Sequence, residues 1–190
     1  MKGFLNIPNI LTLIRLCIVP VLVVVSWKGL STLFLGLLAF AFITDVLDGF
    51  IARTFGLQTK LGAKLDSLAD FAVYMAIPIC AWLLWPDVIR REIFYVIAIV
   101  CSIIFPVVIG LIKFGNYPSY HTWLTKFAAG SMAIASILLF LGGPAWAFRL
   151  AAILCVIAAL EEIIITFLLP EPRSNVRGLW YVLKHRHKHV

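Results

Sequence analysis

The sequence predicts an all-α integral membrane protein with six transmembrane helices, an N-terminal interfacial segment and both termini in the cytosol. Hydrophobic residues make up 63% of the 190 residues, whereas soluble domains are typically about 45–50% apolar. The mean hydropathy is +1.04. Six apolar runs reach the roughly 20 residues that a helix needs to cross a bilayer. The short alternation of a transmembrane barrel is absent, and the spans leave room only for a single membrane domain over residues 1–190.

The expected helices are separated by short connections rich in turn-forming residues. These lie at 28–29, 85–87 and 115–118, where glycine, proline and asparagine favour turns. The glycines and proline at 142–144 make that connection so short that the last two spans should be antiparallel neighbours. The six expected spans are residues 8–27, 31–52, 61–85, 93–112, 123–142 and 145–169.

The N-terminal segment resembles a secretory signal peptide only superficially. Arg15 interrupts its apolar run, and no small-residue cleavage site follows a short hydrophobic core. We therefore expect an interfacial segment that leads into the first span.

The basic residues predict the orientation of the chain. An even number of spans places both termini on one side, and that side holds twelve of the sixteen Lys and Arg residues. Because cytoplasmic loops are enriched in Lys and Arg, the termini should be cytosolic, with a basic tail from about residue 171 to 190. The net charge of +7 then suits anionic lipid headgroups, and no nucleic-acid-binding module accompanies it. The four residues on the opposite side are Lys28, Arg90, Arg91 and Arg149.

Two further patterns concern packing. The four cysteines are scattered singly in apolar surroundings, so neither a disulfide framework nor a zinc site is expected. The fifth span carries a row of small residues, KFAAGSMAIAS, which lets transmembrane backbones approach closely. Packing within the chain and a homodimer contact both fit that row.

Four of the five aspartates of the chain fall between residues 45 and 70, in two pairs next to apolar runs. Asp45 and Asp48 are three residues apart near the end of the second span, and Asp66 and Asp70 are four apart near the start of the third. Either spacing puts both carboxylates of a pair on one helix face. We expect the second and third spans to form an antiparallel hairpin in which the two pairs face each other. The four residues are called the aspartate cluster below.

The energetics favour a metal site at the aspartate cluster. An ionised aspartate in a membrane helix costs about 2.5–3.5 kcal/mol, so four cost on the order of 10 kcal/mol. Nearby cations are only Arg53, Lys60 and Lys64, all closer to water. Two divalent cations would balance the four charges, and carboxylates without His or Cys favour Mg²⁺ or Mn²⁺. Two such ions suit phosphoryl chemistry.

Small residues lie one helical turn from these aspartates. Gly49 and Ala52 follow the first pair, and Gly62 precedes the second. Glycine in a helix costs about 1 kcal/mol relative to alanine. Close approach of a phosphate group and tight helix packing are both possible reasons.

This arrangement resembles the signature of the CDP-alcohol phosphatidyltransferase family. The spacings between the signature residues match throughout, and Asp45 matches an additional aspartate three positions ahead. The six spans and cytosolic termini extend the resemblance to nearly the whole chain. The matching residues are Asp48, Gly49, Ala52, Arg53, Gly62, Asp66 and Asp70.

The resemblance implies transfer of a phosphatidyl group from a CDP-linked lipid to a small alcohol, with release of CMP. It implies that the aspartate cluster holds two divalent ions and that Asp70 is the general base. It also implies a homodimer in a bacterial-type cytoplasmic membrane, with the active site at the cytosolic face. The residues expected to line the CMP site are Gly49, Ala52, Gly62 and, close by, Arg53.

The opening IPNILTLIRL resembles the start of phosphatidylglycerophosphate synthases. Asn9, Thr12 and Arg15 recur every three residues and so share a helix face. We expect Asn9 and Thr12 to contact the nucleotide, and Arg15 to contact a phosphate of the nucleotide or the acceptor. The alternative for Arg15 is a side chain that snorkels to the headgroups.

Several acceptors remain open. Lys113, His121 and Lys126 lie near the fourth connection, and cations there suit a phosphorylated alcohol, which favours glycerol 3-phosphate; they are also consistent with ordinary positive-inside residues. The segment DSLADFAVYMAIP resembles the phosphatidylserine synthase branch instead, so L-serine and inositol phosphate stay as alternatives. Glu161 and Glu162 are intramembrane carboxylates, to which we assign no role.

A small divalent-cation transporter is the alternative from another class. It predicts acidic residues at the bilayer midplane and an inverted repeat. The aspartates instead gather toward one end of their spans, and the sequence shows no such repeat.

Overall fold

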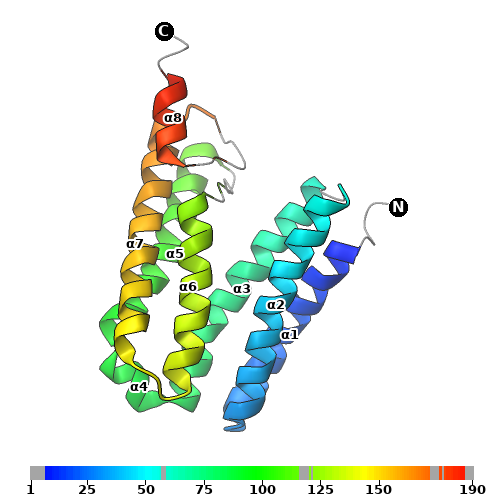
Figure 1. Cartoon of the computed structure of the whole chain (residues 1–190), viewed down its shortest axis with the longest axis vertical. Coiled ribbons are helices and arrows are strands. Elements are labelled where there is room, and N and C mark those ends of the chain that lie inside the picture. Colours follow the sequence, from blue (N-terminus) through cyan, green and yellow to red (C-terminus); the bar gives the residue numbers. More distant parts are fainter. Residues whose placement is uncertain are drawn as a thin grey trace. The chain divides into compact units, whose positions relative to one another are not determined.

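The computed structural model describes residues 7–56, 59–115, 120, 122–171, 176 and 178–186, and its regular elements there are all helices (Figure 1). Six of the described helices are long and apolar enough to cross a membrane, which confirms the expected all-α class and the six candidate spans. They are α1 (Ile7–Trp27), α2 (Ser31–Thr54), α3 (Lys60–Leu84), α5 (Ile93–Phe114), α6 (Trp123–Phe140) and α7 (Ala145–Leu168).

Two short helices were not expected from the sequence. α4 (Pro86–Arg91) begins directly after Trp85, the C-cap of α3, and a proline at the first helical position costs nothing because its missing N–H would be unsatisfied there anyway. α8 (Leu179–Arg186) lies within the segment expected to be a basic tail. The described part of the N-terminal segment, from Ile7 onward, belongs to the continuous helix α1 rather than to a separate element.

The chain divides into two compact units, residues 1–91 and 92–190. In the first unit α1 packs against both α2 and α3. Ile18, Leu22 and Val25 of α1 form the core with buried residues of the other two helices, and Phe34 of α2 meets Trp85 edge-on at a centroid distance of 5.8 Å. The expected two-helix hairpin is therefore incomplete, because α1 is the shared packing partner of the two helices that carry the aspartates.

In the second unit α7 is the shared packing partner, because it packs against α5, α6 and α8. The glycine turn before α7 brings α6 and α7 together as expected, with Gly142 at φ 84° and the Gly143 amide donating to Leu138 O at 2.8 Å. Among the small residues of α6, Ala128, Ala135 and Ser136 are buried, which supports packing within the chain.

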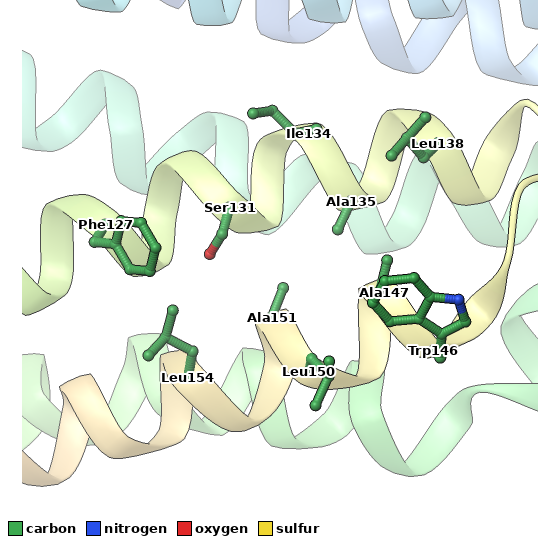
Figure 2. Close-up of a pocket in the computed structure, with 10 residues that line it drawn as sticks. All are labelled: Phe127, Ser131, Ile134, Ala135, Leu138, Trp146, Ala147, Leu150, Ala151 and Leu154. Atoms are coloured by element: carbon green, nitrogen blue, oxygen red, sulfur yellow. The ribbon is translucent and has the colours of Figure 1, made fainter.

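An apolar groove of about 370 Å³ runs between α6 and α7 (Figure 2). Phe127, Trp146 and Leu150 line it, and the Ser131 hydroxyl is a rare polar group in its wall. Because it holds no titratable side chain, this groove is not a candidate for the site of chemistry.

Candidate functional site

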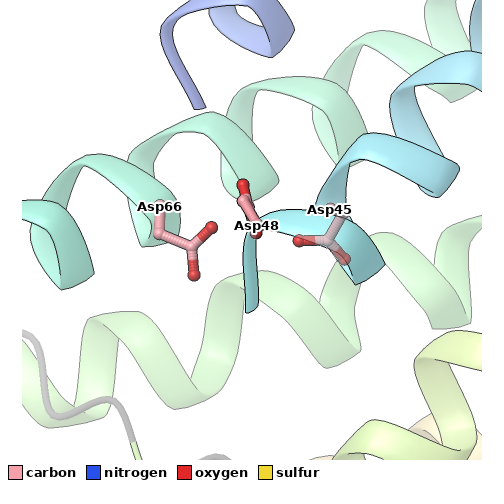
Figure 3. Close-up of side chains that lie close together, drawn as sticks. All are labelled: Asp45, Asp48 and Asp66. Atoms are coloured by element: carbon pink, nitrogen blue, oxygen red, sulfur yellow. The ribbon is translucent and has the colours of Figure 1, made fainter. Parts of the chain in front are cut away.

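The aspartate cluster forms where the end of α2 approaches the start of α3. Carboxylate oxygens of Asp45, Asp48 and Asp66 all lie within 4.8 Å of one another (Figure 3). Asp48 is buried, while the other three are partly buried. The helical spacing seen in the sequence thus brings carboxylates from two helices to one place in the first unit.

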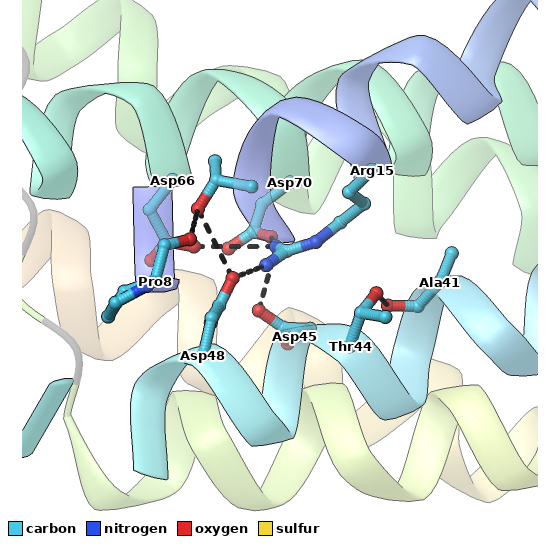
Figure 4. A network of polar contacts seen from close by, with 9 residues as sticks. Pro8, Arg15, Ala41, Thr44, Asp45, Asp48, Asp66 and Asp70 are labelled. Carbon is cyan, nitrogen blue, oxygen red and sulfur yellow. Dashed lines mark hydrogen bonds and ion pairs between the residues drawn. The ribbon is translucent and has the colours of Figure 1, made fainter. Parts of the chain in front are cut away.

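The guanidinium of Arg15, from α1, lies at the centre of this cluster (Figure 4). Its Nη1 donates to Asp45 Oδ1 at 2.8 Å and to Asp66 Oδ1 at 3.4 Å, and also pairs with Asp70. Its Nη2 pairs with Asp48. Arg15 is only 1% exposed, so the alternative of a snorkelling side chain is wrong, and the expected phosphate contact stays a prediction.

Thr12 reaches the same cluster one turn earlier on α1. Its hydroxyl oxygen lies 3.1 Å from Pro8 O and 3.2 Å from Asp48 Oδ2, so its single hydrogen can serve only one of the two at a time. Thr12 is buried. The shared face of α1 that the sequence predicted is therefore turned toward the aspartates, and Thr12 has a hydroxyl next to a predicted metal ligand.

Asn9 of α1 packs against Gly62, which lies in the first turn of α3. Thr59 caps that helix by accepting from the Gly62 amide at 2.9 Å, which satisfies one of the free N–H groups of the helix start. A Cβ at Gly62 would lie 2.5 Å from Asn9 Oδ1 and 2.9 Å from Thr59 Oγ1. The space above this glycine is therefore taken by α1, which supports the packing explanation for Gly62.

The remaining CMP-site residues stay predictions. Gly49 and Ala52 are partly buried on α2, one turn from Asp45 and Asp48. The side chain of Arg53 lies outside the described residues.

The residues expected to bind the acceptor belong to the second unit. Lys113 Nζ donates to Thr166 O at 2.9 Å, to Phe167 O at 3.1 Å and to Leu169 O at 2.9 Å. These bonds use all three hydrogens of the ammonium and satisfy carbonyls at the end of α7, so in this arrangement Lys113 is a C-capping residue. Lys126 is exposed, with its Nζ 5.7 Å from the centre of the Trp123 ring. His121 lies outside the described residues.

Glu161 and Glu162 join three helices of the second unit. Glu161 accepts from the Thr122 hydroxyl at 2.8 Å and from the Leu179 amide at 2.9 Å. Glu162 accepts from the Thr125 hydroxyl at 2.9 Å. Since Thr122 caps α6 and Leu179 begins α8, these carboxylates tie both helix starts to α7. Tyr120 is buried nearby in the same unit, and burial raises the pKa of its phenol.

The chemistry of the donor set fits a hard divalent cation. The group of side chains able to share one ion consists, among the described residues, of carboxylates alone, which Mg²⁺ and Mn²⁺ prefer. The sequence predicted these ligands but missed Arg15 as their common partner. Arg15 is unusual in the sequence because it is a lone cation inside an apolar run. Its neighbours in the sequence do not indicate that its partners lie 30 to 55 residues away.

The model of the CDP-alcohol phosphatidyltransferase family matches residues 5–167. This chain belongs to that family, and the match extends over both compact units.

Curated relatives match over a shorter stretch. A "Probable cardiolipin synthase (CMP-forming)" from Drosophila melanogaster is 46% identical over 70 residues, 36% of this chain and 22% of that protein. A "CDP-diacylglycerol--glycerol-3-phosphate 3-phosphatidyltransferase" from Salmonella choleraesuis is 41% identical over 34% of this chain and 37% of its own length. A "Probable phosphatidylglycerophosphate synthase" from Mycobacterium tuberculosis is 39% identical over 34% of each. The matched stretches thus span well under half of these relatives. No solved structure matches this chain.

Proposed function

We propose that this protein transfers the phosphatidyl group of CDP-diacylglycerol to glycerol 3-phosphate and releases CMP. The observation that carries the proposal is that carboxylates from two candidate membrane helices meet, with Asp45, Asp48 and Asp66 close enough to share one ion. Four carboxylates are costly in membrane helices, and the family to which the chain belongs transfers groups from CDP-alcohols. The name of the relative from Salmonella choleraesuis supplies the acceptor.

The residues that would hold divalent cations are Asp45, Asp48, Asp66 and Asp70. Bound there, the cations would neutralise the charge of the donor's pyrophosphate. Asp70 is the proposed general base. It takes the proton of the acceptor hydroxyl as that oxygen forms a bond to the β-phosphorus of the donor, the phosphorus that carries the diacylglycerol. The bond between that phosphorus and the bridging oxygen breaks, and CMP leaves with the electron pair.

The nucleotide would lie against the start of α3 and the face of α1 that reaches it. Thr12 has a hydroxyl beside Asp48, and Asn9 is buried at Gly62. Gly49 and Ala52 have small side chains that would let the nucleotide approach α2 closely, and Arg53 follows them in the chain. These residues are the proposed CMP site.

The acceptor is the least constrained substrate. Lys113 is held by carbonyl oxygens and Arg15 by the four aspartates, so Lys126 and His121 are the cations left from the sequence-based proposal. One relative is named as a cardiolipin synthase. Phosphatidylglycerol therefore joins L-serine and inositol phosphate as an alternative acceptor.

The proposed site lies at the cytosolic face of a bacterial-type cytoplasmic membrane. Both termini would lie on the same face. A homodimer is proposed from the family resemblance alone.

A CMP-release assay on the purified full-length protein tests the proposal. With CDP-diacylglycerol and Mg²⁺ or Mn²⁺, glycerol 3-phosphate should give the fastest release in a panel that includes serine, inositol phosphate and phosphatidylglycerol. EDTA should stop the reaction. CMP release with none of these acceptors would refute the enzyme proposal, and faster release with another acceptor would replace glycerol 3-phosphate.

The aspartates offer a matched pair of variants for that assay. Asp70→Asn should lower CMP release by about two to four orders of magnitude, as expected when a general base is lost. Asp87→Asn removes the fifth aspartate, whose side chain is 94% exposed on α4, and should leave the rate unchanged. Near-normal turnover by the Asp70 variant would exclude Asp70 as the base. Uptake of Mn²⁺ into proteoliposomes, without CMP release, would favour the transporter alternative.

A further inference from the structure

Arg15 contacts every carboxylate of the aspartate cluster at once. One nitrogen, Nη1, faces oxygens of Asp45, Asp66 and Asp70, and the other, Nη2, faces Asp48. The side chain of Arg15 is only 2% exposed. Its Nε is buried and has no hydrogen-bond partner among the residues that the structure describes. The contacts that hold the guanidinium in place are therefore those of Nη1 and Nη2 with the four carboxylates, and Nε adds none that the structure describes.

A guanidinium in this position occupies the carboxylates that a divalent cation would need. Nη1 lies 2.8 Å from Asp45 Oδ1 and 3.4 Å from Asp66 Oδ1, and both residues belong to the group of carboxylates able to share one ion. Mg²⁺ binds carboxylate oxygens directly, at about 2.0–2.1 Å. The same lone pairs cannot serve both, and two positive charges side by side repel each other.

Charge explains why α1 would carry such a residue. The cluster holds four carboxylates, and Arg15 is the basic side chain that the structure pairs with them. An arginine in the membrane is itself costly to insert, so each charge makes the other tolerable. Arginine suits the place better than lysine, because its planar fork can bridge several carboxylates.

We propose that Arg15 is an internal counter-cation of the aspartate cluster that competes with divalent metal ions for the same carboxylate oxygens. This inference rests on the proposed function, because it takes the aspartates to be the metal ligands. Two consequences follow from the competition. Arg15 stabilises the first unit when no metal is bound, and it lowers the affinity of the site for metal, since Arg15 must move away before an ion can take these oxygens.

The test uses the full-length protein in detergent with two variants. Arg15→Met removes the charge at similar length, and Arg15→Lys keeps the charge without the fork. Mn²⁺ binding is measured from the loss of the electron paramagnetic resonance signal of free Mn²⁺. Thermal unfolding is followed once with EDTA and once with excess Mn²⁺. Arg15→Met should bind Mn²⁺ more tightly than the wild type by about tenfold or more, within the range of coupled sites, and Arg15→Lys should lie between them.

The unfolding data should show the reverse order in EDTA. The wild type should be the most stable, and the deficit of Arg15→Met should shrink when Mn²⁺ is added. If Arg15→Met does not fold in EDTA, Arg15→Lys still gives the affinity comparison. Arg90→Met, on an exposed arginine 3.4 Å from Asp87, is the control and should change neither quantity.

The two proposals fail in different ways. Weaker or unchanged Mn²⁺ binding by both Arg15 variants, with CMP release by the wild type intact, would overturn the competition and leave the proposed function standing. An absence of Mn²⁺ binding by the wild type and all variants would overturn both. Binding by Arg15→Met alone would support a strong form of the competition.

Discussion

Gly62 lies at the start of α3, where the buried side chain of Asn9 occupies the space a larger residue would need. Gly62→Ala would bring a Cβ to 2.5 Å from Asn9 Oδ1 and 2.9 Å from Thr59 Oγ1. Either Asn9 moves or the Thr59 cap breaks, and the loss of a helix cap costs about 0.5–2 kcal/mol. We expect a lower melting temperature in detergent and slower CMP release, because Gly62 lies one helical turn before Asp66 on α3.

Gly36→Ala is the matched control for that prediction. Gly36 is also in a membrane helix, α2, and a Cβ there would meet no atom within 4 Å. Alanine is the better helix former by about 1 kcal/mol, so this variant should be neutral or slightly more stable. Equal effects of the two variants would show that Gly62 is not special for its contacts with Asn9.

The individual side chains of the cluster were predictable to different degrees. The aspartates could be found from the sequence, since an intramembrane carboxylate at helical spacing is unusual and its cost demands a partner. The partner itself could not be found. Arg15 is 30 residues from Asp45 and 55 from Asp70 in the chain, and only the packing of α1 against both α2 and α3 brings them together.

The pairing of Glu92 with Arg149 joins two helices of the second unit. Arg149 of α7 donates from Nε and Nη2 to the two carboxylate oxygens of Glu92, at 2.8 and 3.0 Å, and the Glu92 side chain, just before α5, is fully buried. Arg149→Met would remove both charged donors from a buried carboxylate, which destabilises folded proteins. We expect the melting temperature of Arg149→Met to fall by several degrees.

The double variant Glu92→Gln with Arg149→Met tests the mechanism. An amide in place of the carboxylate removes the charge that needs a partner, so the double variant should recover part of the lost stability. Arg90→Met should have no effect, since the side chains of Arg90 and Asp87 are 66% and 94% exposed and such pairs contribute little. A melting temperature of Arg149→Met equal to that of the wild type would contradict the prediction.

The long helices were predictable because hydropathy and length decide them. All six expected spans agree with the observed helices to within three residues at each end. α4 and α8 are too short, at 6 and 8 residues, to show a clear apolar period. The hairpin expectation was incomplete for a different reason, because chain order shows which helices are consecutive but not that α1 packs against both of them.

The two compact units divide the expected roles unevenly. The aspartates and the predicted CMP-site residues lie in the first unit, whereas Lys113, Lys126 and the two glutamates lie in the second. The family match extends over both units, and the single membrane domain expected from the sequence stays a prediction. The described contacts of Lys113, Glu161 and Glu162 join helices within the second unit. These contacts give the three charged side chains a structural role there.

The orientation of the whole chain is the last prediction. Twelve of the sixteen Lys and Arg residues fall on the side that holds both termini and the aspartates when six spans alternate, so this side should face the cytosol. A fluorescent protein fused after Val190 and expressed in a bacterial host should fluoresce, and alkaline phosphatase at the same position should be inactive. Phosphatase inserted between Gly142 and Gly143, in the connection of α6 and α7, should be active. The reverse pattern would place the aspartates on the outer face, away from cytosolic nucleotide pools, and would contradict both the orientation and the proposed access of the CDP-linked donor.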